Sequence, residues 1–229
     1  YTDFLSKGTK DSIYILNQIY QNKYGVDAIL LAMNQDELRS ALEQAKSIEN
    51  SHFTFNHTTS RKREIFSIRL QHIVQNDDLG VVHTGEHIHY GQVLVNEANC
   101  TLCLSCVGAC NVDALVADAR DNTLRINPSL CTACGYCEVS CPEKDCLSIE
   151  QDVMYLNPSW FKENVLAQDE LFACIECGKE FATKKAVEKI ANMMAPIFSK
   201  MSKTKERTLY CCEDCKAKLM IKEGLLHAY

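Results

Sequence analysis

Fourteen cysteines stand out in this chain of 229 residues, and all of them follow residue 99. Most lie in short runs in which two residues separate one cysteine from the next. Thiols at that spacing can converge on a shared metal centre, whereas disulfide scaffolds occur mainly in short secreted chains. The cysteines therefore predict metal binding in a reducing compartment, for which we expect the cytoplasm.

Two runs of four cysteines repeat one spacing, C-x2-C-x2-C-x3-C, and the second run is followed by Pro142. Three thiolates at this spacing can wrap a tight loop around one face of a cubane cluster, and the fourth cysteine ligates the other cluster. We therefore expect two 4Fe–4S clusters. The first would be held by Cys100, Cys103, Cys106 and Cys141, and the second by Cys131, Cys134, Cys137 and Cys110.

Short apolar segments flank both cysteine runs and are typical of strands. They are Gly91–Val95 and Asn122–Ile126 before the runs, and Ala114–Val116 and Leu147–Ile149 after them. The region from about Tyr90 to Met154 thus resembles the bacterial two-cluster 4Fe–4S ferredoxin domain with its paired hairpins. The resemblance implies electron transfer. Asn111 departs from the family, in which a proline that shapes the turn follows the last cysteine.

Cys146 lies outside the two runs. A spare cluster ligand and a sensor thiol are two interpretations of this residue. Because free cysteine behaves as a small hydrophobic side chain, we favour a third, a buried apolar residue.

The C-terminal cysteines form a second kind of pattern. Cys174 and Cys177 precede Gly178, and Cys212 and Cys215 repeat the C-x2-C spacing. Two such pairs make a tetrahedral four-thiolate site. Cys211 would then be spare, and the alternative pairs Cys211 with Cys215. The site resembles a zinc ribbon with a helical insert, which implies zinc; mononuclear iron and a third cluster are the alternatives.

The insert carries one amphipathic helix, predicted for Thr183–Ala195 and ended by Pro196. Its apolar face, with Ala186, Val187, Ile190 and Met194, is expected to pack on the domain.

Residues 1–80 contain no cysteine and suggest alternating strands and helices. The predicted strands are Tyr1–Leu5, Val26–Met33 and His52–Phe55, and the predicted helices are Asp11–Tyr24, Asp36–Ile48 with Asn34 as its cap, and Ser60–Val74. This order favours a small parallel sheet. The region is loosely similar to small iron–sulfur subunits that link hydrogenases to heterodisulfide reductases, although its loops lack their cysteines.

We therefore expect an α+β multidomain protein with three parts: a small α/β domain with a parallel sheet (1–80), a ferredoxin-like two-cluster domain (81–155) and a zinc-ribbon-like domain with a helical insert (156–229). The net charge of −6 argues against nucleic acid as the partner of the whole chain. Since no apolar run reaches 18 residues, no membrane span is expected.

These features predict an electron carrier, or the ferredoxin domain of a larger oxidoreductase, that docks a redox partner and has no catalytic activity of its own. One alternative is an interaction or assembly protein with structural clusters. Its docking arm would be Lys179–Lys222, where eleven Lys or Arg residues outnumber five Asp or Glu residues. Another is an enzyme with a substrate pocket near Gly8 or Asn34.

Overall fold

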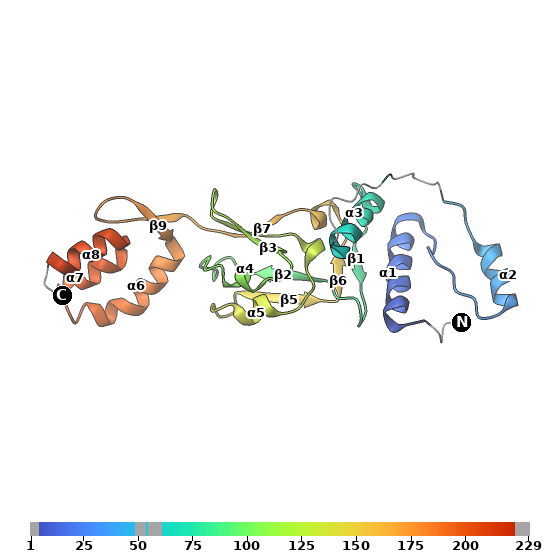
Figure 1. Ribbon diagram of the computed structural model, residues 1–229, viewed down its shortest axis with the longest axis horizontal. Helices are drawn as coiled ribbons and strands as arrows, with labels where there is room; N and C mark the ends of the chain where they lie inside the picture. Colours follow the sequence, from blue (N-terminus) through green and yellow to red (C-terminus); the bar gives the residue numbers. More distant parts are fainter. Residues whose placement is uncertain (1–4, 49–53, 55–60, 223–229) are drawn as a thin grey trace.

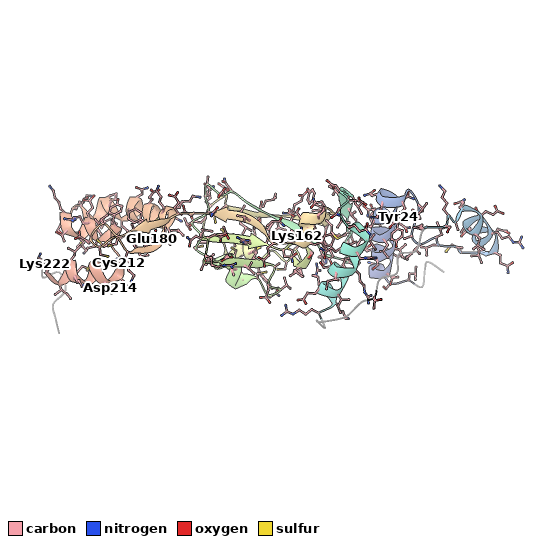
Figure 2. All side chains as sticks on the ribbon, turned by 90° about the horizontal axis from the view of Figure 1, so that it is seen from above. Tyr24, Lys162, Glu180, Cys212, Asp214 and Lys222 are labelled. Atoms are coloured by element: carbon pink, nitrogen blue, oxygen red, sulfur yellow. The ribbon has the colours of Figure 1, made fainter. Side chains whose placement is uncertain are left out.

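The computed structural model describes residues 5–48, 54 and 61–222. Its ribbon is elongated: helices from the N-terminal region lie at one end, small sheets fill the middle, and helices from the C-terminal region lie at the other end (Figure 1). Seen from above, the labelled Tyr24 and Lys222 lie toward opposite ends of the molecule (Figure 2). The described part of the chain has no helix that is long and apolar enough to span a membrane.

The three predicted N-terminal helices are present as α1 (Lys7–Tyr24), α2 (Gln35–Gln44) and α3 (Lys62–Val74). The predicted parallel sheet is wrong, because the described residues before Val81 form no strand and every sheet of the described chain is antiparallel. The predicted strands Tyr1–Leu5 and His52–Phe55 lie outside the described residues except for Leu5 and Thr54.

The segment Val26–Met33 is apolar, yet it runs as an irregular connection. The Asn17 side chain on α1 donates to the carbonyl of Ile29 and accepts from its N–H, both at 2.9 Å. A side chain therefore takes the backbone bonds that a neighbouring strand would have made. Leu30, Leu31 and Met33 remain more than 40% exposed, so the segment gains little from burial.

Helices α1 and α3 pack on strands from the middle of the chain. Those strands are β1 (Val81–His83) and β6 (Val153–Tyr155), which pair with each other, and the 3-10 helix η3 (Pro158–Phe161) follows them. The buried residues of this core include Ile15, Ile19, Leu70, Val74, Val82, Tyr90, Met154, Leu156 and Trp160. The core thus draws on both sides of residues 80 and 155, and the predicted domain limits at those positions remain predictions.

The predicted hairpin strands around the cysteine runs are confirmed. Strand β2 (Gly91–Val95) pairs with β5 (Leu147–Gln151), and β3 (Leu115–Asp118) pairs with β4 (Thr123–Ile126), which also pairs with β7 (Asn164–Gln168). Helices α4 (Ser105–Ala109) and α5 (Tyr136–Ser140) pack together, and the 3-10 helix η2 (Pro128–Leu130) precedes the second cysteine run. The cysteine loops thus lie between two antiparallel sheets (Figure 1).

The C-terminal part begins with a hairpin of β8 (Leu171–Ala173) and β9 (Glu180–Thr183). Four helical elements follow: α6 (Lys184–Phe198), α7 (Lys203–Arg207), the 3-10 helix η4 (Thr208–Tyr210) and α8 (Glu213–Lys222).

The predicted end of α6 at Pro196 is wrong, because the helix continues to Phe198. Proline lacks only its own N–H, and the bond from Ser199 N to Ala195 O (2.9 Å) still closes the last turn. Of the predicted apolar face, Val187 is buried, whereas Ile190 is 52% exposed.

Polar contacts attach α6 to the ferredoxin-like region. Thr183 donates its hydroxyl to the carbonyl of Thr101 (2.8 Å), and Lys185 Nζ donates to the carbonyl of Glu97 (2.7 Å). Lys189 also forms an ion pair with Glu143. The C-terminal part is therefore tied to the loops of both cysteine runs.

Candidate metal centres

The first predicted cluster set surrounds a single cavity. Cys100, Cys103 and Cys106 from the first run line it together with Cys141 from the second run. The other residues that line this cavity are mostly apolar. The fourth cysteine of one run thus faces the first three cysteines of the other.

The second predicted set surrounds a matching cavity. Cys131, Cys134 and Cys137 line it with Cys110, the last cysteine of the first run. Each predicted set of four ligands has two buried cysteines, one exposed cysteine and one of intermediate burial. The two halves therefore present their thiols in the same pseudo-symmetric way.

The loops curl through backbone conformations that bring amides toward sulfur. Leu102 and Leu104 have positive φ values of 53° and 61°, and Ala133 and Gly135 repeat them with 50° and 82°. One result is that Ala133 N–H donates to Cys131 Sγ at 3.4 Å. Left-handed conformations are costly for residues other than glycine, so their recurrence in both loops indicates a selected geometry.

The buried thiols are strongly perturbed. Burial, with the neighbouring Cys100 and Cys103 thiols, raises the pKa of Cys106 to about 11. Burial, with Cys131 and then Cys106 among its neighbours, raises the pKa of Cys137 to about 12. Without a cation these thiols would remain protonated, and cluster iron is the kind of cation that would hold them as thiolates. Cys106 lines the first cavity and Cys137 the second, and the two lie on helices α4 and α5, which pack together.

Arg63 of α3 contacts the second site, a residue that the spacing of the cysteines did not reveal. Its guanidinium donates to the carbonyls of Cys131 (2.6 Å) and His89 (2.9 Å) and lies 4.0 Å from the centre of the Tyr90 ring. A cation at the ligand loop stabilises the more negative, reduced form of a cluster.

Replacing Arg63 by alanine should lower the reduction potential of the second cluster by tens of millivolts, an order-of-magnitude expectation for the loss of one nearby charge. The measurement is a redox titration followed by EPR. Lys62→Ala is the matched control, because it removes an exposed charge from the same helical turn. Equal shifts in both variants would contradict a specific role of Arg63.

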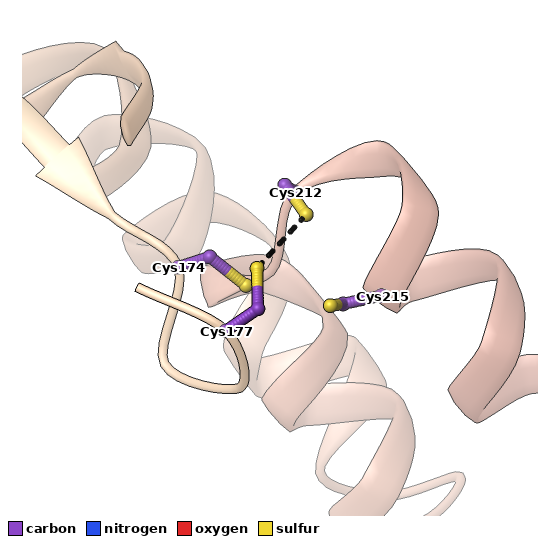
Figure 3. A group of neighbouring side chains, drawn as sticks. All are labelled: Cys174, Cys177, Cys212 and Cys215. Carbon is purple, nitrogen blue, oxygen red and sulfur yellow. Dashed lines mark hydrogen bonds between the residues drawn. The ribbon is translucent and has the colours of Figure 1, made fainter. Parts of the chain in front are cut away.

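The four C-terminal cysteines converge at one point (Figure 3). Cys174 and Cys177 lie in the loop between β8 and β9, and Cys212 and Cys215 lie at the start of α8. Their sulfur atoms all lie within 4.8 Å of one another, and the Cys177 and Cys212 sulfurs are 3.7 Å apart. Four thiolates about 2.3 Å from one metal ion would be about 3.8 Å apart, so the donors fit a single tetrahedral ion.

Local electrostatics also suit a cation at this point. Burial raises the pKa of Cys174, but backbone N–H groups of Cys212, Glu176 and Cys177 donate to its sulfur and lower the pKa to about 6 overall. A hydrogen bond with Cys177, followed by burial, raises the pKa of Cys215 to about 12. Gly178, with φ of 75°, allows the turn in which its N–H donates to the carbonyl of Cys174 (2.8 Å).

Cys211 lies outside this group of four. It is 4% exposed, and its thiol donates to the carbonyl of Arg207 at 3.3 Å. Cys146 is buried, as expected from the sequence: it is 5% exposed and lines the first cavity beside the four predicted ligands. Its position five residues after Cys141 was the one signal in the sequence.

A comparison with curated proteins finds no match. A family model described as a 4Fe–4S dicluster domain matches residues 92–148, which include both cysteine runs and Cys146. This match and the converging cysteines near the C-terminus support an iron–sulfur, metal-binding protein, and the dicluster domain suggests a function in electron transfer.

Proposed function

We propose that this chain transfers electrons through two 4Fe–4S clusters to a docked redox partner, as a carrier or as part of a larger oxidoreductase. The observation that carries the proposal is the pair of cavities, each lined by three cysteines of one run and the fourth of the other. Two clusters joined by crossed ligands would lie close together, which suits electron hopping.

The burial of the ligands suggests the path that electrons would take between the clusters and a partner at the surface. Cys106 and Cys137 are buried where α4 and α5 pack together, so they would lie between the clusters. Cys103 and Cys134 are exposed, one at each site. Each cluster would therefore have one buried side toward the other cluster and one side from which a partner can exchange electrons.

Zinc is our proposal for the four-thiolate site, where it would stabilise the C-terminal helices. Thiolates from two C-x2-C pairs are the usual ligands of structural zinc. The thiols of this chain fit a reducing compartment such as the cytoplasm.

Anaerobic purification followed by iron, sulfide and zinc quantitation and a redox titration tests the proposal. We expect about eight irons and about one zinc per chain and two clusters that are reduced reversibly. Clusters that are present but resist reversible reduction would overturn the electron-transfer function.

A second candidate, a docking protein with structural clusters, is favoured by one surface feature. Ile190, Met193, Ile197 and Met201 are each more than half exposed, and the first three follow helical spacing along α6. This stripe belongs to the basic segment Lys179–Lys222, so an acidic protein is the expected partner. Clusters that resist reduction in a chain that still binds such a partner would favour this candidate.

A further inference from the structure

The two cluster cavities differ in their number of thiols. Four cysteines line the second cavity, whereas five line the first. The additional residue is Cys146, which is 5% exposed. A cubane with one cysteine per iron needs four thiolates, so the first cavity holds one thiol more than its cluster requires.

Cys146 occupies a position that the other half of the domain fills with alanine. In both halves an aspartate with positive φ, Asp113 at 54° and Asp145 at 51°, directly precedes this position. Ala114 follows Asp113 and lines the second cavity; Cys146 follows Asp145 and lines the first. The pseudo-symmetric fold thus places a thiol in one site where the other has a methyl group.

The sulfur of Cys146 lies among the ligands. It lines the same cavity as Cys100 and Cys141, and it lies 3.9 Å from the carbonyl oxygen of Asn96. The loop that follows Cys141 is also one residue longer than the corresponding loop of the other half. Four residues separate Cys141 from Cys146, whereas three separate Cys110 from Ala114.

We propose that Cys146 is an alternative ligand of the first cluster and can take the place of Cys141. The inference depends on the proposed presence of that cluster. In the exchange, Cys141 releases its iron and Cys146 binds it, while the proton of the Cys146 thiol passes to the Cys141 sulfur. One iron–sulfur bond breaks, one forms, and no electron is transferred. The first cluster would thereby keep four ligands when Cys141 is lost or modified.

Substitution of ligands in the full-length chain tests the exchange, with the second site as an internal control. Cys141→Ala should keep the iron content of the wild type, whereas Cys141→Ala with Cys146→Ala should lose at least one iron per chain and show the EPR signal of a three-iron cluster. Cys110→Ala, whose site has Ala114 in place of a thiol, should lose iron without any second substitution. Cys146→Ala alone should keep the full iron content.

If the wild type is fully loaded and Cys141→Ala loses as much iron as the double variant, the ligand exchange is overturned but the proposed function is not. A wild-type chain without the first cluster would overturn the proposed function as well. Because variants of the predicted ligands could misfold, a second measurement leaves all eight predicted ligands in place. Under a mild oxidant, Cys146→Ala should lose iron several-fold faster than the wild type, and equal rates would overturn the inference.

Discussion

Removing Cys110 and Cys131 together should leave one intact four-iron cluster, whereas removing Cys110 and Cys103 together should leave none. The first pair of residues lines one cavity, and the second pair is divided between two cavities. A site that keeps only two thiolates cannot hold its cluster, but its neighbour keeps all four. When each site loses one thiolate, both clusters are damaged.

Iron and sulfide quantitation with EPR on anaerobically purified alanine variants makes the comparison. The first double variant should retain about half of the iron and the signal of an intact reduced cluster. The second should show three-iron signals in its oxidised state. Cys103 suits this test because it is the exposed ligand, whereas Cys146 interacts with Cys100 and Cys141. The reverse pattern would mean that each run holds its own cluster.

Local cysteine spacing predicted the middle of this chain well. A C-x2-C-x2-C run has to curl tightly, so strands before and after it follow from the motif itself, and these strands were found. Strands β3 and β4 form a hairpin, whereas β2, before the first run, pairs with β5, after the second. The same spacing favoured Cys212 and left Cys211 as the alternative, and the sulfur of Cys212 is the one that converges with Cys174, Cys177 and Cys215. These features depend on residues within short distances of a motif, where sequence reasoning is strongest.

The prediction of an N-terminal parallel sheet was wrong because it depended on contacts between distant segments. An apolar run such as Val26–Met33 predicts a strand only if a partner strand is available, and the sequence does not show which backbone groups find which partners. Here Asn17 satisfies Ile29 from a helix. The contact of Arg63 with the second site likewise joins distant segments, so no motif revealed it. For Cys146 the sequence offered a spare ligand as one interpretation, but its place in the first cavity depends on how the loop folds back.

The C-terminal part of the chain should unfold when Cys212 is replaced by serine or when its metal is removed by a chelator. Among its described residues, the hydrophobic cluster at the four-cysteine site has Cys174, Cys211 and Cys212 as buried members, with Phe181, Cys215 and Leu219 packed around them. The other buried apolar side chains of residues 171–222 are Val187, Ala191 and Leu209. Such a core is too small to hold α6, α7 and α8 by apolar burial alone. A structural zinc ion supplies about 10–16 kcal/mol of apparent binding free energy in small zinc domains, which here would be folding free energy.

Cys211 provides the matched control for Cys212, because the two cysteines are adjacent and both are buried, with 4% and 1% exposure. Cys211→Ser should cost about 1 kcal/mol of unfolding free energy and keep the metal. Cys212→Ser should lose the metal, lower the helical circular dichroism signal and expose residues 171–222 to limited proteolysis. Cluster absorbance should stay unchanged in both, since the cysteine runs lie outside this site. Metal retained by Cys212→Ser but lost by Cys211→Ser would assign Cys211 as the ligand. A Cys212→Ser chain that loses the metal but keeps its helical signal would show that the ion does not hold these helices.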